Sequence, residues 1–125
     1  MAGRRIRSPK VQESEYPYSK AIAAGNFIFV SGCVPRWPDG RIITDDIKAG
    51  TRQCLEDIKN LLEAGGMSFT DLVKVNVHLK NIDDFDAMNA VYRTHFPGDP
   101  PARATQQAGI GGSAIMEVEA IAYKD

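Results

Sequence analysis

The chain has 125 residues, of which 43% are hydrophobic and 25% are charged, and its formal net charge is −1. These values predict one globular domain with its own core, without the basic surface typical of nucleic-acid binding. No apolar run exceeds four residues, which excludes a membrane-spanning helix, and no apolar stretch follows the basic start as in a secretory signal. Cys33 and Cys54 form no metal or redox motif, so we expect reduced, cytoplasmic surroundings.

The first part of the chain is polar and then becomes strand-like. We expect residues 1–15 to be a mobile tail and residues 16–125 to form the single domain. Residues 20–24 predict a short strand, and the aromatic and β-branched run 27–30 predicts another that is covered on both faces. This strand ends at Ser31-Gly32, where the missing side chain lets another group approach the backbone closely.

The middle of the chain changes from a helical period to a strand period. Apolar residues recur at helical spacing from about Asp46 to Ala64, and Gly65-Gly66 then gives a C-terminal signal. Residues 72–79 alternate between apolar and polar side chains, which predicts a strand. Because its second face is polar but carries little charge, we expect a subunit interface there.

The last part of the chain predicts a helix followed by two strands. Asp83 is expected to cap a helix that runs to about Phe96, and the prolines within residues 97–101 break it. A strand follows in which Arg103, Thr105 and Gln107 share one face, and a final strand spans residues 115–123. This order of elements predicts an α+β fold, with two helices covering one face of a sheet.

Arg103 and Glu117 are the side chains best suited to chemistry. If their strands pair as a hairpin, the two residues could meet across the ladder. They would then form either a structural ion pair or a catalytic site. In a site, Arg103 would hold a substrate carboxylate and Glu117 would position or deprotonate a water. The two histidines lack metal-ligand spacing, so we expect neither a metal nor a cofactor.

Several segments match one known family in order and spacing. They are Pro17–Ala21, Gly25–Gly32, Thr51-Arg52-Gln53, Asp84-Phe85 with Asn89, Val91 and Tyr92, Pro100–Arg103, and Glu117–Ala122. From Pro17 to Tyr123 the chain resembles the RidA family, also called the YjgF family, of reactive-intermediate imine deaminases.

The resemblance implies a chorismate-mutase-like fold with one mainly antiparallel six-stranded sheet covered on one face by two helices. It also implies a homotrimer with a central β-barrel and active sites between subunits. The implied reaction is hydrolysis of enamines and imines, such as 2-aminoacrylate and 2-aminocrotonate, to 2-keto acids and ammonia without a cofactor.

The resemblance also suggests roles for individual residues. Arg103 matches the catalytic arginine of the family, which binds the substrate carboxylate, and Glu117 matches its water-positioning glutamate. Other residues are expected to line or shape the substrate pocket: Tyr18, Ser31, Gly32, Asn89 and Thr105. Thr105 stands where many relatives carry a cysteine.

Two departures from the family bear on the substrate. Cys33 replaces a glutamine that is common after the Ser-Gly pair, and the glycine-rich loop 109–113 is shorter than usual. A dedicated catabolic deaminase of the 2-aminomuconate type therefore stays open as an alternative. So does a module that binds a small carboxylic acid without turning it over. The net charge of −1 weighs against a ribonuclease.

Overall fold

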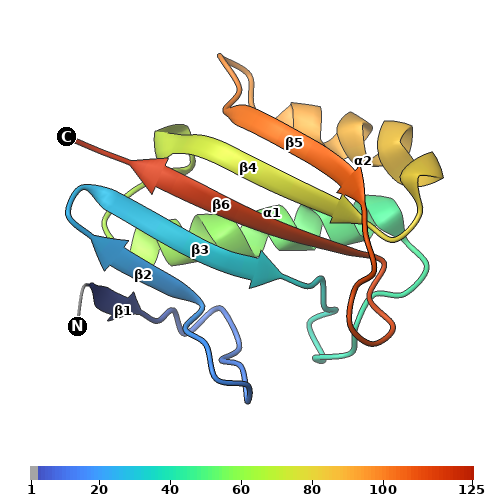
Figure 1. Ribbon diagram of the computed structural model, residues 1–125, viewed down its shortest axis with the longest axis horizontal. Coiled ribbons are helices and arrows are strands. Elements are labelled where there is room, and N and C mark those ends of the chain that lie inside the picture. Colours follow the sequence, from blue (N-terminus) through green and yellow to red (C-terminus); the bar gives the residue numbers. More distant parts are fainter. Residues whose placement is uncertain (1–2) are drawn as a thin grey trace.

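The computed structural model describes residues 3–125, which form one six-stranded sheet with both helices on the same face (Figure 1). The strands are β1 (Arg4–Ile6), β2 (Ala21–Ala24), β3 (Phe27–Cys33), β4 (Leu72–Leu79), β5 (Ala102–Gln107) and β6 (Met116–Tyr123). The helices are α1 (Ile47–Ala64) and α2 (Phe85–Tyr92), and short 3-10 turns span Phe69–Asp71, Ile82–Asp84 and Arg93–His95. The predicted α+β class is confirmed.

The strand order across the sheet is β1-β2-β3-β6-β4-β5. All neighbouring strands are antiparallel except β4 and β5, which are parallel. A parallel pair needs a crossover, and α2 supplies it between β4 and β5. Since β4 lies between β5 and β6, the strands of Arg103 and Glu117 do not pair as a hairpin, and the two residues do not meet across a ladder.

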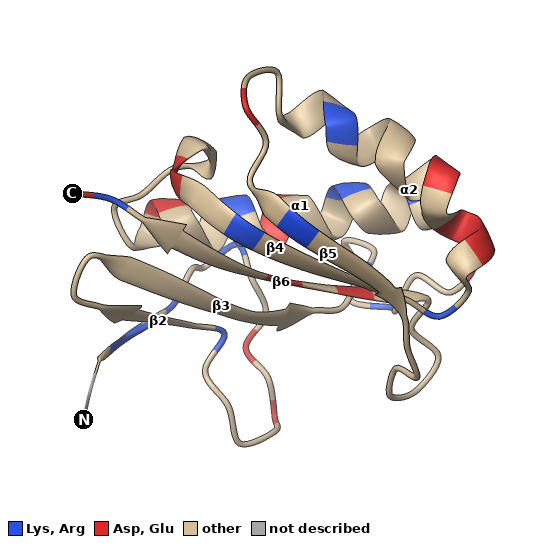
Figure 2. Cartoon of the chain, turned by 45° about the horizontal axis from the view of Figure 1, so that its top comes forward, with Lys and Arg blue, Asp and Glu red and all other residues tan. Residues whose placement is uncertain are grey.

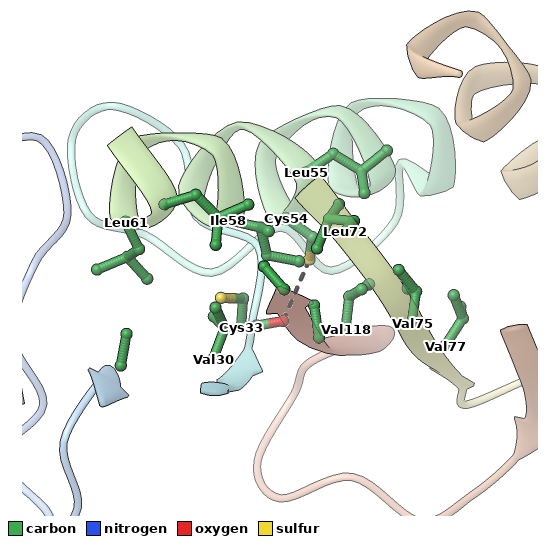
Figure 3. Close-up of a cluster of buried hydrophobic side chains, with 14 of the residues drawn as sticks. Val30, Cys33, Cys54, Leu55, Ile58, Leu61, Leu72, Val75, Val77 and Val118 are labelled. Atoms are coloured by element: carbon green, nitrogen blue, oxygen red, sulfur yellow. Dashed lines mark hydrogen bonds between the residues drawn. The ribbon is translucent and has the colours of Figure 1, made fainter. Parts of the chain in front are cut away.

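Helix α1 covers the middle of the sheet, as its apolar period predicts. Asp46 caps its start by accepting a hydrogen bond from the Ala49 backbone N at 3.0 Å. The chain leaves the helix through Gly65 and Gly66, and Gly66 adopts a φ of +85°, which favours glycine. The buried side chains of α1 pack against β3 and β6, as the core in Figure 3 shows. Neither helix of residues 3–125 has the length and apolar character needed to cross a membrane.

Helix α2 begins differently from the prediction. Asp83 does not cap it; instead the Asn81 side chain accepts a hydrogen bond from the Asp83 backbone N at 2.9 Å. A 3-10 turn over Ile82–Asp84 then leads into the helix. The Asn81 side chain thus satisfies a backbone donor at the start of the turn, two residues before the predicted position.

The predicted tail, residues 1–15, begins with two residues outside the described part of the chain, and its remainder contacts the domain. Strand β1 pairs with β2, and the side chains of Ile6 and Val11 are buried in the core. Arg5 also forms an ion pair with Glu13 at 2.7 Å. Two apolar side chains among many polar ones are enough to attach this segment, because β2 offers an unpaired edge.

The sheet face opposite the helices carries an exposed aromatic cluster. Phe27 and Phe29 on β3 are 40% and 44% exposed, although this strand was expected to be covered on both faces. The Phe27 ring lies 5.0 Å from that of Tyr123 and 5.8 Å from that of Phe29. Exposed aromatic clusters of this kind mark interaction surfaces.

Candidate active site

The predicted site residues fall into two groups on opposite faces of the sheet. Arg103 pairs in register with Val75, whose buried side chain points toward the helices, so Arg103 lies on the helix face. Glu117 pairs with His78 on the open face. Figure 2 shows the basic segment of β5 beside α2, with β4 separating it from the acidic segments of β6. The sheet therefore keeps the two groups apart within one chain.

The first group, named here the Arg103 group, consists of Arg103, Thr105 and three residues of α2. The Arg103 Nη1 donates a hydrogen bond to Asn89 Oδ1 at 2.7 Å. Its guanidinium carbon lies 4.6 Å from the ring centre of Tyr92 and 5.7 Å from that of Phe85. These contacts arise because positions 85, 89 and 92 share one stripe of the helix.

The charge of Arg103 is unpaired. No carboxylate of residues 3–125 lies within 4.0 Å of its guanidinium, which is half-buried between β5 and α2. A half-buried arginine without an acidic partner leaves N–H donors free for an external anion, and a planar carboxylate fits its fork. The Arg103 group can therefore bind a carboxylate.

Two hydroxyl groups beside Arg103 are also unsatisfied. Tyr92 Oη and Thr105 Oγ1 are buried and have no hydrogen-bond partner among residues 3–125. Burial raises the pKa of Tyr92, while the nearby Arg103 opposes this shift. A buried polar group without a partner costs about 1–3 kcal/mol, and such groups are typical of ligand sites.

The second group, named here the Glu117 group, borders an open cavity of about 540 Å³. Glu117, Tyr18 and Lys20 line it, with further walls from residues 12–16 and 110–112. A Cβ atom at Gly32 would overlap the Glu117 carboxylate, so the glycine lets this carboxylate lie against β3. The structure thus explains the predicted importance of Gly32 through Glu117.

Ser31 has a supporting place in the Glu117 group. Its Oγ donates a hydrogen bond to the Ser19 carbonyl at 2.6 Å, and its backbone N donates to the Lys20 carbonyl at 2.9 Å. These two bonds attach the segment of Tyr18 and Lys20 to β3. Ser31 is therefore placed to hold the cavity wall rather than to line the cavity itself.

Glu117 differs from the neighbouring acid on the same face of β6. Glu119 Oε1 accepts a hydrogen bond from Asn76 Nδ2 at 3.2 Å and lies 3.2 Å from His78 Nε2. Glu117 has no such polar partner among the described residues and faces the cavity. Of these two carboxylates, Glu117 is the one free to contact a substrate or water.

Two nearby groups complete the electrostatics of the cavity region. Burial raises the pKa of Asp57 to about 6, against the opposing charges of Lys20 and Arg36. Burial, followed by the negative charge of Asp57, raises the pKa of the Cys33 thiol to about 12. The Cys54 Sγ donates to the Cys33 carbonyl at 3.2 Å (Figure 3). Both thiols are buried, so neither is a nucleophile, as the apolar position of Cys54 predicted.

The structure brings the predicted residues together in these two groups and adds three side chains that had been assigned no role from the sequence. Phe85 and Tyr92 of the Arg103 group were interpreted only as the apolar side of a helix, and Lys20 was placed in a strand without a role. The signal for the first two was their spacing around Asn89, which puts all three on one helical stripe. Within residues 3–125, no cluster of His, Cys, Asp or Glu could hold a metal ion.

Comparison with known proteins identifies the family. The family described as endoribonuclease L-PSP matches residues 9–124. A RutC family protein of Pyrococcus horikoshii is 49% identical over 111 residues, which cover 87% of this chain and 88% of that protein. The 2-iminobutanoate/2-iminopropanoate deaminase of Rattus norvegicus is 36% identical, covering 95% of this chain and 88% of that protein.

A solved structure agrees with these sequence matches. The crystal structure of Escherichia coli TdcF with bound serine superposes with a TM-score of 0.91 at 28% identity. The match covers 98% of this chain and 99% of that chain. The chain therefore belongs to the endoribonuclease L-PSP family, the YjgF/RidA family that the sequence resembles. This family includes proteins named as deaminases of reactive imine intermediates.

Proposed function

We propose that this protein hydrolyses 2-imino acids and their enamine tautomers to 2-keto acids and ammonia, without a cofactor. In this proposal each site forms between two subunits, with the Arg103 group from one and the Glu117 group from the other. The observation that carries it is the pair of unpaired charges on opposite faces of the sheet. The rat relative named as a 2-iminobutanoate/2-iminopropanoate deaminase supports the reaction class.

The Arg103 group holds the substrate by its carboxylate. With Nη1 bonded to Asn89, the guanidinium still offers N–H donors for two parallel hydrogen bonds to the two carboxylate oxygens. Thr105 Oγ1, which is buried and without a partner in the described chain, can supply a further donor. This grip fixes the imine carbon relative to the water and turns hydration into a reaction within one complex.

Glu117 then acts as the general base and general acid of the reaction. Its carboxylate removes a proton from a water while the water oxygen bonds to the imine carbon and the C=N electron pair moves to nitrogen. Glu117 returns this proton to nitrogen, which gives a carbinolamine. The hydroxyl proton of the carbinolamine then passes to nitrogen through Glu117, the C–N bond breaks, and ammonia leaves as the C–O bond becomes the 2-keto group. General acid–base catalysis of this kind contributes about 10²–10⁴-fold to rate.

The proposed assembly is a homotrimer with a central β-barrel formed by the open sheet faces. The exposed aromatic cluster of Phe27, Phe29 and Tyr123 on that face supports this proposal, because burial between subunits removes it from water. Phe29→Arg places a charge in this cluster. We expect light scattering to show monomers, circular dichroism to show a retained fold, and deaminase activity to be lost. An active monomer would contradict a shared site.

The first experiment couples the protein to a serine or threonine dehydratase and follows the loss of released imine against its spontaneous hydrolysis. Wild type should accelerate this loss and Arg103→Ala should not, whereas Arg93→Ala, at an exposed neighbouring arginine, should retain activity. If a 2-keto acid binds but no imine is consumed, the protein is a carboxylate-binding module instead. Cleavage of added RNA without imine hydrolysis would favour the activity in the family description.

A second experiment tests whether the site is shared. Arg103→Ala and Glu117→Gln are each expected to be inactive alone. If they are refolded together in equal amounts, a site between subunits regains about one quarter of wild-type activity, because one site in four then combines two intact groups. Glu119→Gln serves as the matched control for Glu117→Gln, because Glu119 occupies the same face of β6. No recovery in the mixture would place the whole site within one subunit.

A further inference from the structure

Tyr92 is a core residue of α2 that also contacts the Arg103 guanidinium. It is 6% exposed and its hydroxyl has no partner among residues 3–125. Burial of the hydroxyl is a cost, which the neighbouring Arg103 guanidinium offsets in part. The Tyr92 ring also faces Arg103: its centre lies 4.6 Å from the guanidinium carbon.

The Tyr92 ring is itself held in place by a row of aromatic side chains. Its centre lies 4.7 Å from that of Phe96, which lies 5.0 Å from that of Phe69. These rings come from three elements, namely α2, the loop after it, and the turn before β4. An aromatic ring supported in this way presents a rigid face to a cation, and attraction to such a face is worth about 0.5–2 kcal/mol.

Asn89 acts on the same guanidinium from a second direction. Its Oδ1 accepts from Nη1 at 2.7 Å, so one N–H of the guanidinium is already occupied. The ring contact and the hydrogen bond to Asn89 together restrict how the guanidinium can turn. Only part of its edge then remains free for a ligand.

We infer that Tyr92 and Asn89 are positioning residues that hold the Arg103 guanidinium in one orientation, so that a single edge is offered to the substrate carboxylate. The inference rests on the proposed function, in which Arg103 binds that carboxylate. It also assigns Asn89 a role through Arg103 in place of the predicted contact with substrate. The raised pKa of Tyr92 fits this role, because a neutral phenol leaves the charge of Arg103 available.

The test uses 2-ketobutyrate, an unreactive product-like carboxylate, and titration calorimetry on the full-length protein. Tyr92→Leu removes the ring face, and we expect its Kd to rise about tenfold. Tyr92→Phe keeps the face and should bind within about twofold of wild type. Leu61→Ala, a substitution of a buried core residue of α1 outside this row, controls for lost packing. The uncharged amide of 2-ketobutyrate should bind all four proteins equally weakly.

The role of Asn89 is tested by one substitution that removes its hydrogen bond to Arg103 and one that replaces the amide with a carboxylate. Asn89→Leu frees Nη1 and should weaken 2-ketobutyrate binding, whereas Asn89→Asp supplies an internal carboxylate and should nearly abolish it. In the coupled assay, Tyr92→Leu should raise KM with little change in kcat. Equal binding by Tyr92→Leu and wild type, or equal losses in Tyr92→Phe and Tyr92→Leu, would overturn the inference.

A readout without ligand separates this inference from the proposed function. The Nε–H resonance of Arg103, identified by its loss in Arg103→Lys, should lie in the ring-current field of Tyr92 and move in Tyr92→Leu but little in Tyr92→Phe. If this resonance does not move, the inference fails, whatever binds. If it moves as expected but no 2-keto acid binds and no imine is hydrolysed, the proposed function fails and the positioning of Arg103 stands.

Discussion

The Arg103 group and the Glu117 group are built by different parts of the architecture. A strand and a facing helix hold Arg103, with a hydrogen bond to Asn89 and a ring contact to Tyr92. Glu117 also lies on a strand, but the cavity beside it is walled largely by loop residues 12–16 and 110–112. Regular elements fix geometry, whereas loops vary in length and shape. Under the proposed function, this difference predicts that carboxylate binding is the constant part of the site and that substrate size is set on the Glu117 side.

The largest expected effect on activity comes from a substitution in the Arg103 group, which a strand and a helix hold in place. Arg103→Lys keeps the positive charge but loses the planar fork, and we expect kcat/KM in the coupled assay to fall about 100-fold. The fold should be retained, since the substitution leaves the core unchanged. Arg93→Lys, at an exposed position just after α2, should behave as wild type. Full activity in Arg103→Lys would show that a point charge is sufficient.

A smaller effect is expected from the glycine under Glu117. In Gly32→Ala the new Cβ displaces the carboxylate, which can turn into the open cavity. We expect kcat to fall about tenfold with KM unchanged, since carboxylate binding occurs on the other side of the site. Gly98→Ala is the control, because a Cβ there meets no atom within 4 Å. A change in KM alone would contradict this division of roles.

Asp57 of α1, near Lys20, should give the stability a dependence on pH. Burial raises the pKa of Asp57 from 3.8 to about 6, so the folded state holds this proton more tightly than the unfolded state. The stabilisation is complete below pH 3.8 and is lost as pH rises through about 6. Because the carboxyl is partly solvated, we expect a loss of roughly 1 kcal/mol in the free energy of unfolding.

The measurement compares urea unfolding of wild type and Asp57→Asn at several pH values. The variant lacks the titrating group, so it does not lose this stabilisation. Its free energy of unfolding relative to that of wild type should therefore increase as the pH rises from 3.8 to about 6. Glu63→Gln, at an exposed position of the same helix, should follow wild type throughout. Parallel curves for Asp57→Asn and wild type would show that this carboxyl titrates normally.

The smallest effect concerns the thiols behind the Glu117 group. Cys33 and Cys54 are buried, and the pKa of Cys33 is raised to about 12. We therefore expect iodoacetamide at pH 8 to leave the native protein unmodified and fully active, and to modify both cysteines in urea. Mass spectrometry provides the measurement. Rapid modification of the native protein with loss of activity would place a thiol within the site.

Much of the local structure could be predicted from the sequence because its signals are local. The apolar period of residues 46–64 and the alternation of residues 72–79 both produced the expected elements, α1 and β4. The chemistry of Arg103 and Glu117 could also be predicted, because a guanidinium and a carboxylate carry their charges wherever they lie. The predicted Asp83 cap of α2 was wrong, because a 3-10 turn capped by Asn81 comes first and the N-cap position of α2 is Asp84, whose side chain makes no capping hydrogen bond.

What the sequence alone determined is which residues form helices and strands and which side chains can bind a carboxylate or move a proton. Only the tertiary structure decided that β4 lies between β5 and β6, and hence that Arg103 and Glu117 occupy opposite faces. It also decided that residues 4–6 join the sheet. The physical reason is that strand pairing joins residues far apart in sequence, and a strand's own residues specify its two faces but not its neighbours.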